Sequence, residues 1–237
     1  MKRIVVLSGA GMSADSGIST FRDSGGLWEG HDVMEVASPE GYRKNPDLVL
    51  DFYNKRRRQL FEVVPNAGHR ILADLESYFE IQIITQNVDD LHERAGSSKV
   101  LHLHGELLKA RSTGPNQRVY PWKKDLGPAD YCEEGYPLRP HIVWFGEAVP
   151  LLEIAAELVM DAEILIVVGT SLQVYPAAGL LGYKKRGVPL YFIDPNPSLN
   201  AGDLDTLSIL REKAATGLPI LADQLIDTWR GSDSPMP

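Results

Sequence analysis

Short apolar runs recur along the chain and are separated by amphipathic or polar stretches. Most of the six runs are rich in Val, Ile and Leu without alternating polar residues, which is typical of strands buried on both faces of a parallel sheet. The amphipathic stretches predict helices that cover such a sheet. The predicted strands are Ile4–Leu7, Ile81–Thr85, Val100–Leu103, Ile142–Phe145, Ile164–Val168 and Leu190–Ile193, and the predicted helices are Ala67–Tyr78, Leu151–Met160, Ala177–Arg186 and Ile220–Trp229.

This alternation predicts an α/β fold, with a Rossmann-like parallel sheet and helices on both faces. Two stretches interrupt the alternation: Gly25–Val64, with a helix expected at about Asp47–Phe61, and Glu106–Pro140, which is rich in Gly, Pro and charge. Together they are expected to form a smaller second domain, with ligands bound between it and the sheet. The expected Rossmann-like domain is 1–24, 65–105 and 141–237, and the expected small domain is 25–64 and 106–140.

Composition narrows the possible environments and partners of the chain. Its 237 residues, 43% of them hydrophobic, can bury a full core. Cys132 is the only cysteine, so no intramolecular disulfide forms, and no secretory leader or membrane-spanning run is recognised. We therefore expect a cytoplasmic protein without a membrane partner. The net charge of −8 opposes nucleic-acid binding, apart from one local basic cluster, Lys55–Arg58.

The first predicted strand leads into a glycine-rich turn and a predicted helix start. Gly9, Gly11 and Ala14 have the G-x-G-x-x-G/A spacing, which lets the backbone approach a pyrophosphate at the N-terminus of the next helix. The spacing predicts a dinucleotide site, and a glycine-rich connection without a ligand is the alternative. No second strand ends in an acid about 20 residues later, as one does in an ordinary Rossmann unit. The polar stretch that follows, with Phe21 and Arg22, is instead predicted to be a lid loop.

Polar side chains follow the second predicted strand, Ile81–Thr85. Gln86, Asn87 and Asp89 stand where that strand ends, and polar groups at the carboxyl end of a buried parallel strand face the ligand crevice. Asn and Asp are also good helix N-caps, so Asn87 or Asp89 could cap the following helix. Both interpretations can hold together.

Two histidines, His102 and His104, stand two residues apart at the end of the third predicted strand and so share a face. A metal pair is one interpretation, but no third ligand is evident nearby. His104 comes last, next to Gly105, where it can reach the cleft, and imidazole suits general-base catalysis near neutral pH. We therefore predict His104 as the general base and His102 as a structural or supporting residue.

Hydrogen-bonding groups also follow two later strands. Gly169, Thr170 and Ser171 can offer backbone and hydroxyl groups to a phosphate or ribose. Asp194 ends the strand Leu190–Ile193, and an acid in that position suits a ribose diol.

These motifs carry a resemblance to a known family. The run GAGMSADSGISTFRD resembles the opening of the sirtuins, the NAD-dependent protein deacylases, and TQNVDDLHERAG resembles their TQN-x-D-x-L-H-x-x-A-G motif. The resemblance covers the chain from Gly9 to about Ala215, with five motifs in family order. It implies NAD as co-substrate, Asn87 and Asp89 at the nicotinamide end, Gln86 at the adjacent ribose and His104 as the catalytic base.

The resemblance also implies further binding residues. Sirtuins more often carry Asn where Asp194 stands, so the adenosine end is expected to be contacted differently. The segment Pro140–Glu147 resembles the family's substrate-binding segment and, with Gln173–Tyr175, would pair with an extended peptide. The implied NAD-binding residues are Gly9, Ala10, Gly11, Ala14, Phe21, Arg22, Trp28, Gln86, Asn87, Asp89, Gly169, Thr170, Ser171, Asp194, Asn196 and Ala215, and the implied substrate-binding residues are Tyr53, Arg56, Val143, Phe145, Gly146, Glu147 and Val174.

The implied activity is deacylation of protein lysine side chains. The acyl-lysine oxygen attacks the nicotinamide ribose, nicotinamide leaves, and His104 takes a proton from the ribose hydroxyl system. The acyl group then passes to ADP-ribose and NAD is consumed. A protein ADP-ribosyltransferase is the alternative reading, while a redox dehydrogenase and a non-catalytic NAD sensor fit the motifs less well.

Two departures refine this interpretation. Most sirtuins hold the small domain with two cysteine pairs on one zinc, whereas this chain has only Cys132, so we expect no metal. Tyr53 and Arg56 stand three apart on a predicted helix and resemble the Y-x-x-R motif of the sirtuin branch that removes succinyl and malonyl groups. Arg pairs with a carboxylate in two-point geometry, although a basic helix face is usually solvated. The packing expected to replace zinc involves Val119, Tyr120, Trp122, Tyr131, Tyr136 and Leu138.

Overall fold

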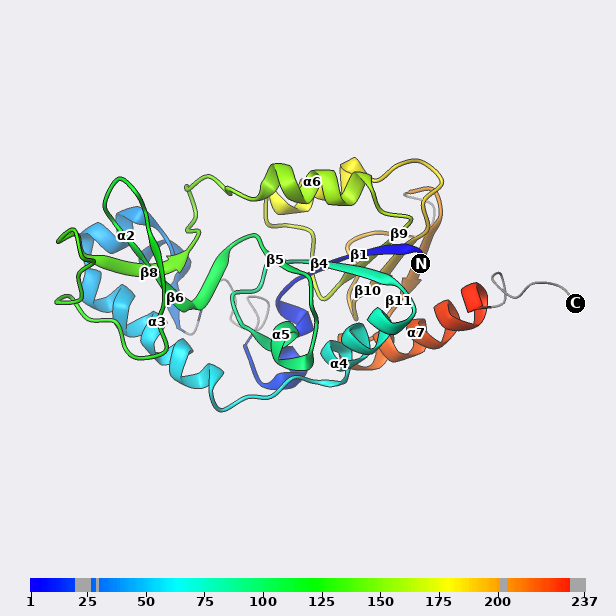
Figure 1. Ribbon diagram of the computed structural model, residues 1–237, viewed down its shortest axis with the longest axis horizontal. Helices are drawn as coiled ribbons and strands as arrows, with labels where there is room; N and C mark the ends of the chain where they lie inside the picture. Colours follow the sequence, from blue (N-terminus) through cyan, green and yellow to red (C-terminus); the bar gives the residue numbers. More distant parts are fainter. Residues whose placement is uncertain (20–26, 29, 201–203, 231–237) are drawn as a thin grey trace, which may run out of the picture.

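The computed structural model describes residues 1–19, 27, 28, 30–200 and 204–230, and its main feature is a six-stranded parallel sheet (Figure 1). The sheet confirms the predicted Rossmann-like α/β class. The strand order is β11-β10-β9-β1-β4-β5. The bounds are β1 (Arg3–Ser8), β4 (Glu80–Thr85), β5 (Val100–His102), β9 (Ile164–Val168), β10 (Leu190–Ile193) and β11 (Leu207–Leu210).

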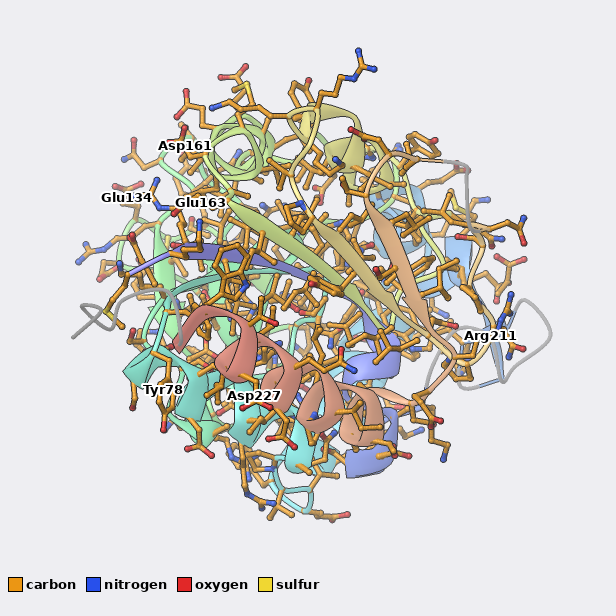
Figure 2. All side chains as sticks on the ribbon, turned by 90° about the vertical axis from the view of Figure 1, so that its right-hand side faces the viewer. Tyr78, Glu134, Asp161, Glu163, Arg211 and Asp227 are labelled. Carbon is orange, nitrogen blue, oxygen red and sulfur yellow. The ribbon has the colours of Figure 1, made fainter. Side chains whose placement is uncertain are left out.

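Helices cover both faces of this sheet, because alternate residues of its central strand are apolar on both sides. Ile4 and Val6 of β1 pack with α4 (Ala67–Asp74) and α7 (Ala214–Arg230). The neighbouring residues Val5 and Leu7 pack on the other face, against α6 (Leu152–Met160) and the 3₁₀ helix η5 (Ala177–Tyr183). Figures 1 and 2 show α6 on one side of the sheet and α7 on the other. Among the described residues, no helix combines the length and apolar character needed to cross a bilayer.

A smaller group of elements lies beside the carboxyl end of the sheet (Figure 1). This group contains a three-stranded antiparallel sheet with the strand order β7-β6-β8 and a two-stranded sheet of β2 and β3. The bounds are β2 (Leu27–Trp28), β3 (His31–Asp32), α1 (Val33–Val36), α2 (Pro39–Lys44), α3 (Pro46–Leu60), β6 (Gly105–Ser112), β7 (Val119–Pro121) and β8 (Leu138–Ile142), and the remaining elements are α5 (Leu91–Ala95) and the single-turn 3₁₀ helices η1 (Ala10–Met12), η2 (Ala14–Ser16) and η4 (Leu75–Ser77).

The structure corrects three sequence predictions. The apolar run Ile142–Phe145 is not a strand of the parallel sheet: β8 ends at Ile142 and pairs with β6 in the small sheet. An apolar run shows burial but not the partner strand, and Pro140, which has no N–H, is tolerated because β8 is an edge strand. The helix expected after β1 is two 3₁₀ turns, and the helix expected at Ala177–Arg186 is also 3₁₀. Gly17, with φ of 96°, ends the second turn after β1.

The expected packing of the region around Cys132 is only partly present. Leu138, Tyr120 and Trp122 pack in a cluster with Leu50, Ala110, Leu126 and Cys132. Val119, Tyr131 and Tyr136 are 40%, 56% and 40% exposed, so the prediction that they hold this region was wrong. Helix α3 replaces them, since Leu50 enters the cluster and the Asn54 side chain bonds both Leu126 N and Leu126 O.

The loops after β1 and β9 touch backbone to backbone. The Gly11 N–H donates to the Gly169 carbonyl over 2.8 Å, and the Gly9 N–H donates to Val168 O. Gly169 has a φ of 60°, and a Cβ there would lie 2.3 Å from Met12 N. Both the left-handed backbone and the close approach therefore require glycine.

The Gly169→Ala substitution should lower the free energy of unfolding by about 2–4 kcal/mol, because it combines left-handed strain with a backbone clash. Gly187→Ala is the matched control, since Gly187 has φ of 82° but no atom within 4 Å of an added Cβ. The control should lose only about 1 kcal/mol. Urea unfolding of both variants measures the difference, and equal losses would contradict the close contact.

Candidate active site

A cavity of about 770 Å³ opens at the carboxyl ends of β1, β4 and β9, between the parallel sheet and the smaller group of elements. This size is typical of sites for small ligands and cofactors. Its wall includes the predicted residues Gly9, Ala10, Gly11, Ala14, Trp28, Tyr53, Arg56, Gln86, Asn87, Asp89, His104, Val143, Phe145, Gly146, Glu147, Gly169, Thr170, Ser171, Val174, Asp194 and Asn196.

Three predicted residues do not appear in that wall. Phe21 and Arg22 lie outside the described residues. Ala215 is on the first turn of α7, but its neighbour Ala214 lines the cavity instead. The helix was predicted at Ile220–Trp229, and α7 begins earlier, at Ala214.

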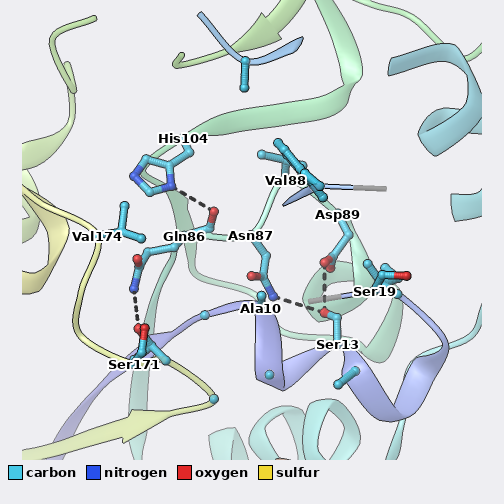
Figure 3. A pocket seen from close by; sticks show the side chains of 18 of the residues that line it. Ala10, Ser13, Ser19, Gln86, Asn87, Val88, Asp89, His104, Ser171 and Val174 are labelled. Atoms are coloured by element: carbon cyan, nitrogen blue, oxygen red, sulfur yellow. Dashed lines mark hydrogen bonds between the residues drawn. The ribbon is translucent and has the colours of Figure 1, made fainter. Parts of the chain in front are cut away.

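A buried hydroxyl connects the loops after β1 and β4 (Figure 3). The Asn87 side-chain amide donates to Ser13 Oγ over 3.1 Å, and Ser13 Oγ donates to Asp89 Oδ2 over 2.9 Å. Ser13 is 1% exposed. Ser13 thus holds both the Asn87 carboxamide and the Asp89 carboxylate, which fixes the two side chains at the cavity wall. Sequence reasoning missed Ser13, although a serine between the small residues of the turn was a usable signal.

Asp89 has two roles at once. Its Oδ1 accepts from Leu91 N over 3.1 Å at the first residue of α5, but the N-cap of that helix is Asp90, so neither Asn87 nor Asp89 is the cap that the sequence suggested. The same residue lines the cavity. Burial raises the pKa of Asp89, and the hydrogen bond from Ser13 opposes this rise.

His104 follows the end of β5 and lines the cavity. Its Nδ1 lies 3.1 Å from Gln86 O, and since a carbonyl only accepts, Nδ1 carries the hydrogen. In the described part of the chain, Nε2 has no hydrogen-bond partner. Burial lowers the pKa of His104, against the effect of the bond to Gln86. The ring is therefore neutral at pH 7, with Nε2 able to accept a proton.

His102 does not join His104 in a metal site. Its Nδ1 lies 3.1 Å from Asn87 O and its Nε2 lies 2.7 Å from Glu93 Oε1. Among the residues that the structure describes, no three His, Cys, Asp or Glu side chains are grouped as metal ligands.

The loops after β9 and β10 form the other end of the cavity. The Gln86 side chain donates to Thr170 Oγ1 over 3.1 Å, which joins the β4 and β9 loops. Asp194 is 2% exposed, and its Oδ1 accepts from Asn196 N over 2.8 Å. These groups offer amide, hydroxyl and carboxylate contacts, a donor and acceptor set that suits ribose and phosphate groups.

The side chains of Tyr53 and Arg56 lie together in the wall formed by α3. The Arg56 guanidinium stacks over the Trp28 ring, with 4.3 Å from Cζ to the ring centroid. Tyr53 Oη accepts from Trp144 Nε1 over 3.0 Å. Burial raises the pKa of Tyr53 far above its ordinary value, so the phenol stays protonated. This end of the cavity therefore combines a cation with a neutral hydroxyl.

The predicted substrate segment lines the mouth of the cavity, with Phe145 39% exposed. Glu147 is committed to the protein itself. Its carboxylate accepts from Arg139 over 2.6 Å, from Arg111 over 2.9 Å and from Trp144 N over 2.8 Å. Glu147 thus holds the shape of the segment 143–147.

Known proteins share this sequence and this fold. The Sir2 family model matches residues 9–176. A protein of Helicobacter pylori strain J99, named NAD-dependent protein deacylase, is 57% identical over 96% of this chain and 97% of its own length. A Bacteroides thetaiotaomicron protein of the same name is 52% identical, covering 95% of this chain and 99% of its own.

Solved structures agree with these relatives. A Sir2 homologue–NAD complex superposes with a TM-score of 0.83 at 39% identity, covering 98% of this chain and 91% of that chain. A mutant Sir2 homologue bound to ADP-ribose superposes with a TM-score of 0.88 at 38% identity, covering 99% and 95%. The cavity residues that follow β1, β4, β5 and β9 lie within the matched segment, and the chain belongs to the Sir2 family.

Proposed function

We propose that this protein is an NAD-dependent protein-lysine deacylase that transfers the acyl group to ADP-ribose and releases nicotinamide. The observation that carries the proposal is the placement of His104, with an available Nε2, in the same cavity as the Asn87–Ser13–Asp89 group and the glycine turn. The deacylase name of its relatives supports the reaction class.

The cavity has the size and the donor set that NAD requires. The turn at Gly9 and Gly11 and the loop at Gly169–Ser171 would hold the phosphates, and Asp194 and Asn196 would face the adenosine ribose. NAD would supply an electrophilic ribose carbon and a leaving nicotinamide, and the ribose would receive the acyl group.

Residues of this chain would orient NAD, accept the proton and bind the peptide. Asn87 and Asp89 would orient the nicotinamide end, since Ser13 fixes both. His104 would take a hydroxyl proton of the ribose at Nε2, while the carbonyl of Gln86 holds Nδ1–H and so fixes the tautomer. Val143–Glu147 and Val174 would hold the acylated peptide at the mouth of the cavity, mainly through the backbone.

We propose that Arg56 and Tyr53 extend the substrate range to succinyl- and malonyl-lysine. The guanidinium, placed over Trp28, would pair with the acyl carboxylate, and Tyr53 would add a hydroxyl. A buried cation beside a neutral phenol favours an acidic acyl group without excluding acetyl.

We further propose a small domain without zinc, formed by residues 25–64 and 106–140, in which the second segment packs on α3 of the first. Cys132 is free, and its sulfur accepts from Ser112 Oγ. A single thiolate cannot supply a tetrahedral Cys₄ site. A reducing compartment suits the free cysteine, and we place the protein in the cytoplasm.

The reaction itself is tested with purified protein, NAD and matched acetyl-lysine and succinyl-lysine peptides, analysed by mass spectrometry. We expect free lysine peptide, nicotinamide and O-acyl-ADP-ribose in equal amounts. The His104→Ala variant should lose at least about 100-fold in kcat, the usual contribution of a general base. His141→Ala, a neighbouring histidine outside the cavity wall, is the control. ADP-ribose on the peptide or protein would support a transferase instead.

The acyl pocket is tested with Arg56→Met. We expect kcat/KM for succinyl peptide to fall about 10- to 100-fold, since a charge-assisted pair contributes about 1.5–3 kcal/mol. The value for acetyl peptide should change by less than about threefold. Arg58→Met, on the same helix but paired with Asp125 at 2.6 Å, is the matched control. Equal losses for both peptides would remove Arg56 from the acyl pocket.

The absence of zinc is tested by metal analysis of protein purified without chelators. We expect far less than one zinc per chain, and an unfolding midpoint that EDTA does not change, because bound structural zinc stabilises the folded state. Near-stoichiometric zinc would overturn this part of the proposal.

A further inference from the structure

The predicted supporting histidine, His102, lies behind the cavity wall and contacts the loop that carries Asn87. The residue is 9% exposed. Its Nδ1 is 3.1 Å from Asn87 O, and its Nε2 is 2.7 Å from Glu93 Oε1 on α5. One ring therefore bridges the Asn87 peptide and the helix that follows it.

The number of protons in this bridge follows from its partners. A backbone carbonyl and an ionised carboxylate can only accept hydrogen bonds, whereas a neutral imidazole has only one N–H to donate. Both contacts are made at once only if the ring is an imidazolium. The bridge is therefore an ion pair between His102 and Glu93, with the second imidazolium N–H directed at Asn87 O.

The surrounding charges favour this state. Burial lowers the pKa of His102, but the hydrogen bond and charge of Glu93, with help from Asn87 O and Glu106, raise it above its ordinary value. The other charged group nearby on β6 is Lys109, which pairs with Glu106. Asp89 on the same loop and His92 on α5 also interact with the His102 charge.

The bridge acts on Asn87, which the proposed function places at the nicotinamide end of NAD. The Asn87 N–H donates to Thr85 Oγ1 over 3.0 Å, and its side-chain amide donates to Ser13. His102 supplies the contact to its carbonyl, so the two peptide groups that flank Asn87 are each held while its side chain faces the cavity (Figure 3). Loss of the His102 contact would free the Asn87–Val88 peptide group to rotate.

We propose that His102 is a positioning residue for the deacylase reaction: its imidazolium, paired with Glu93, holds the Asn87 carbonyl and thereby orients the amide that faces the reacting ribose. The inference rests on the proposed function for its catalytic consequence. We expect deprotonation of His102 to lower the activity at alkaline pH, because the ring then loses one of its two hydrogen bonds.

The sign of the pH effect follows from the raised pKa of His102. The imidazolium and both bonds are present while Glu93 is ionised and the pH is below the ordinary pKa of histidine, and they are lost as the pH rises through the higher pKa of His102 in the folded protein. Activity that depends on the position of Asn87 therefore falls on the alkaline side, whereas His104 acts in its neutral form and does not cause this loss.

The Glu93→Gln variant separates this model from a merely structural role. A glutamine amide can donate to Nε2 of a neutral His102, so Nδ1–H still bonds Asn87 O and both contacts persist without any charge. The variant should keep the loop in position while removing the titration. Glu106→Gln, which removes a charge of the same sign nearby but bonds Lys109, is the matched control.

We would measure kcat and the KM for NAD from pH 7 to 9.5 on an acetyl-lysine peptide. In wild type and Glu106→Gln, kcat should fall at least about tenfold at the alkaline end, the effect of losing one hydrogen bond to a charged group, with little change in KM. In Glu93→Gln the fall should be less than about twofold. An alkaline limb shared by all three proteins would overturn the positioning role.

Histidine ¹⁵N NMR supplies a readout that needs no activity. Both ring nitrogens of His102 should be protonated at pH 7 in wild type and only one in Glu93→Gln, and the Val88 amide, which shares the peptide of Asn87 O, should shift with the same midpoint in wild type. A neutral His102 in wild type, or a Val88 amide that does not follow it, would overturn the inference. If wild type releases no nicotinamide from NAD, the proposed function fails, and the NMR result still decides whether the pair holds the loop.

Discussion

The parallel register of β1 with its two neighbours is the constraint on which the site depends. Ser8 at the end of β1 stands beside Thr85 of β4 and Val168 of β9, so three strands end level. The chain order reverses between β1 and β9, and such a switch point opens a crevice at the carboxyl edge of an α/β sheet. The loops that start at Gly9, Gln86 and Gly169 meet because their strands end at the same level of the sheet. The glycines let these backbones touch, and the polar residues that follow each strand become neighbours.

This arrangement requires polar side chains inside the protein, where each must be neutral or paired. His69 and His92 lie near the hydroxyls of Ser13 and Ser8, and burial lowers the pKa of His69 to about 4 and that of His92 well below its ordinary value. Both rings are therefore uncharged at neutral pH. His102 is the exception, since a carboxylate accompanies it. Its charge in turn lowers the pKa of Asp89, which burial raises, so the imidazolium also helps Asp89 to remain ionised.

Sequence reasoning predicted the parallel sheet because continuous apolar runs are typical of strands buried on both faces. It predicted the strand-end part of the cavity wall for a related reason: residues that follow parallel strands share one edge, wherever they stand in the chain. The predictions of Trp28, Tyr53, Arg56 and the segment 143–147 came instead from the resemblance to sirtuins. It failed where partners are chosen through space. β11 is a four-residue strand at the sheet edge with no fully buried position, and β6 carries charged residues, so neither has the signature of a core strand. The link from Asn87 through Ser13 to Asp89 joins residues 74 and 76 positions apart, which no local pattern encodes.

The region around Cys132 illustrates how tertiary contacts can stabilise a stretch of chain with a single cysteine. One thiolate cannot supply a Cys₄ metal site. Here α3 supplies the missing contacts: Leu50 packs into the cluster of Ala110 and Leu138, and Asn54 forms two hydrogen bonds with the Leu126 backbone. The same helix carries Tyr53 and Arg56 into the cavity wall. The element that stabilises the region around Cys132 is thus also the element that places Tyr53 and Arg56 in the cavity wall, so packing changes around Leu126 would be transmitted to the cavity through a single helix.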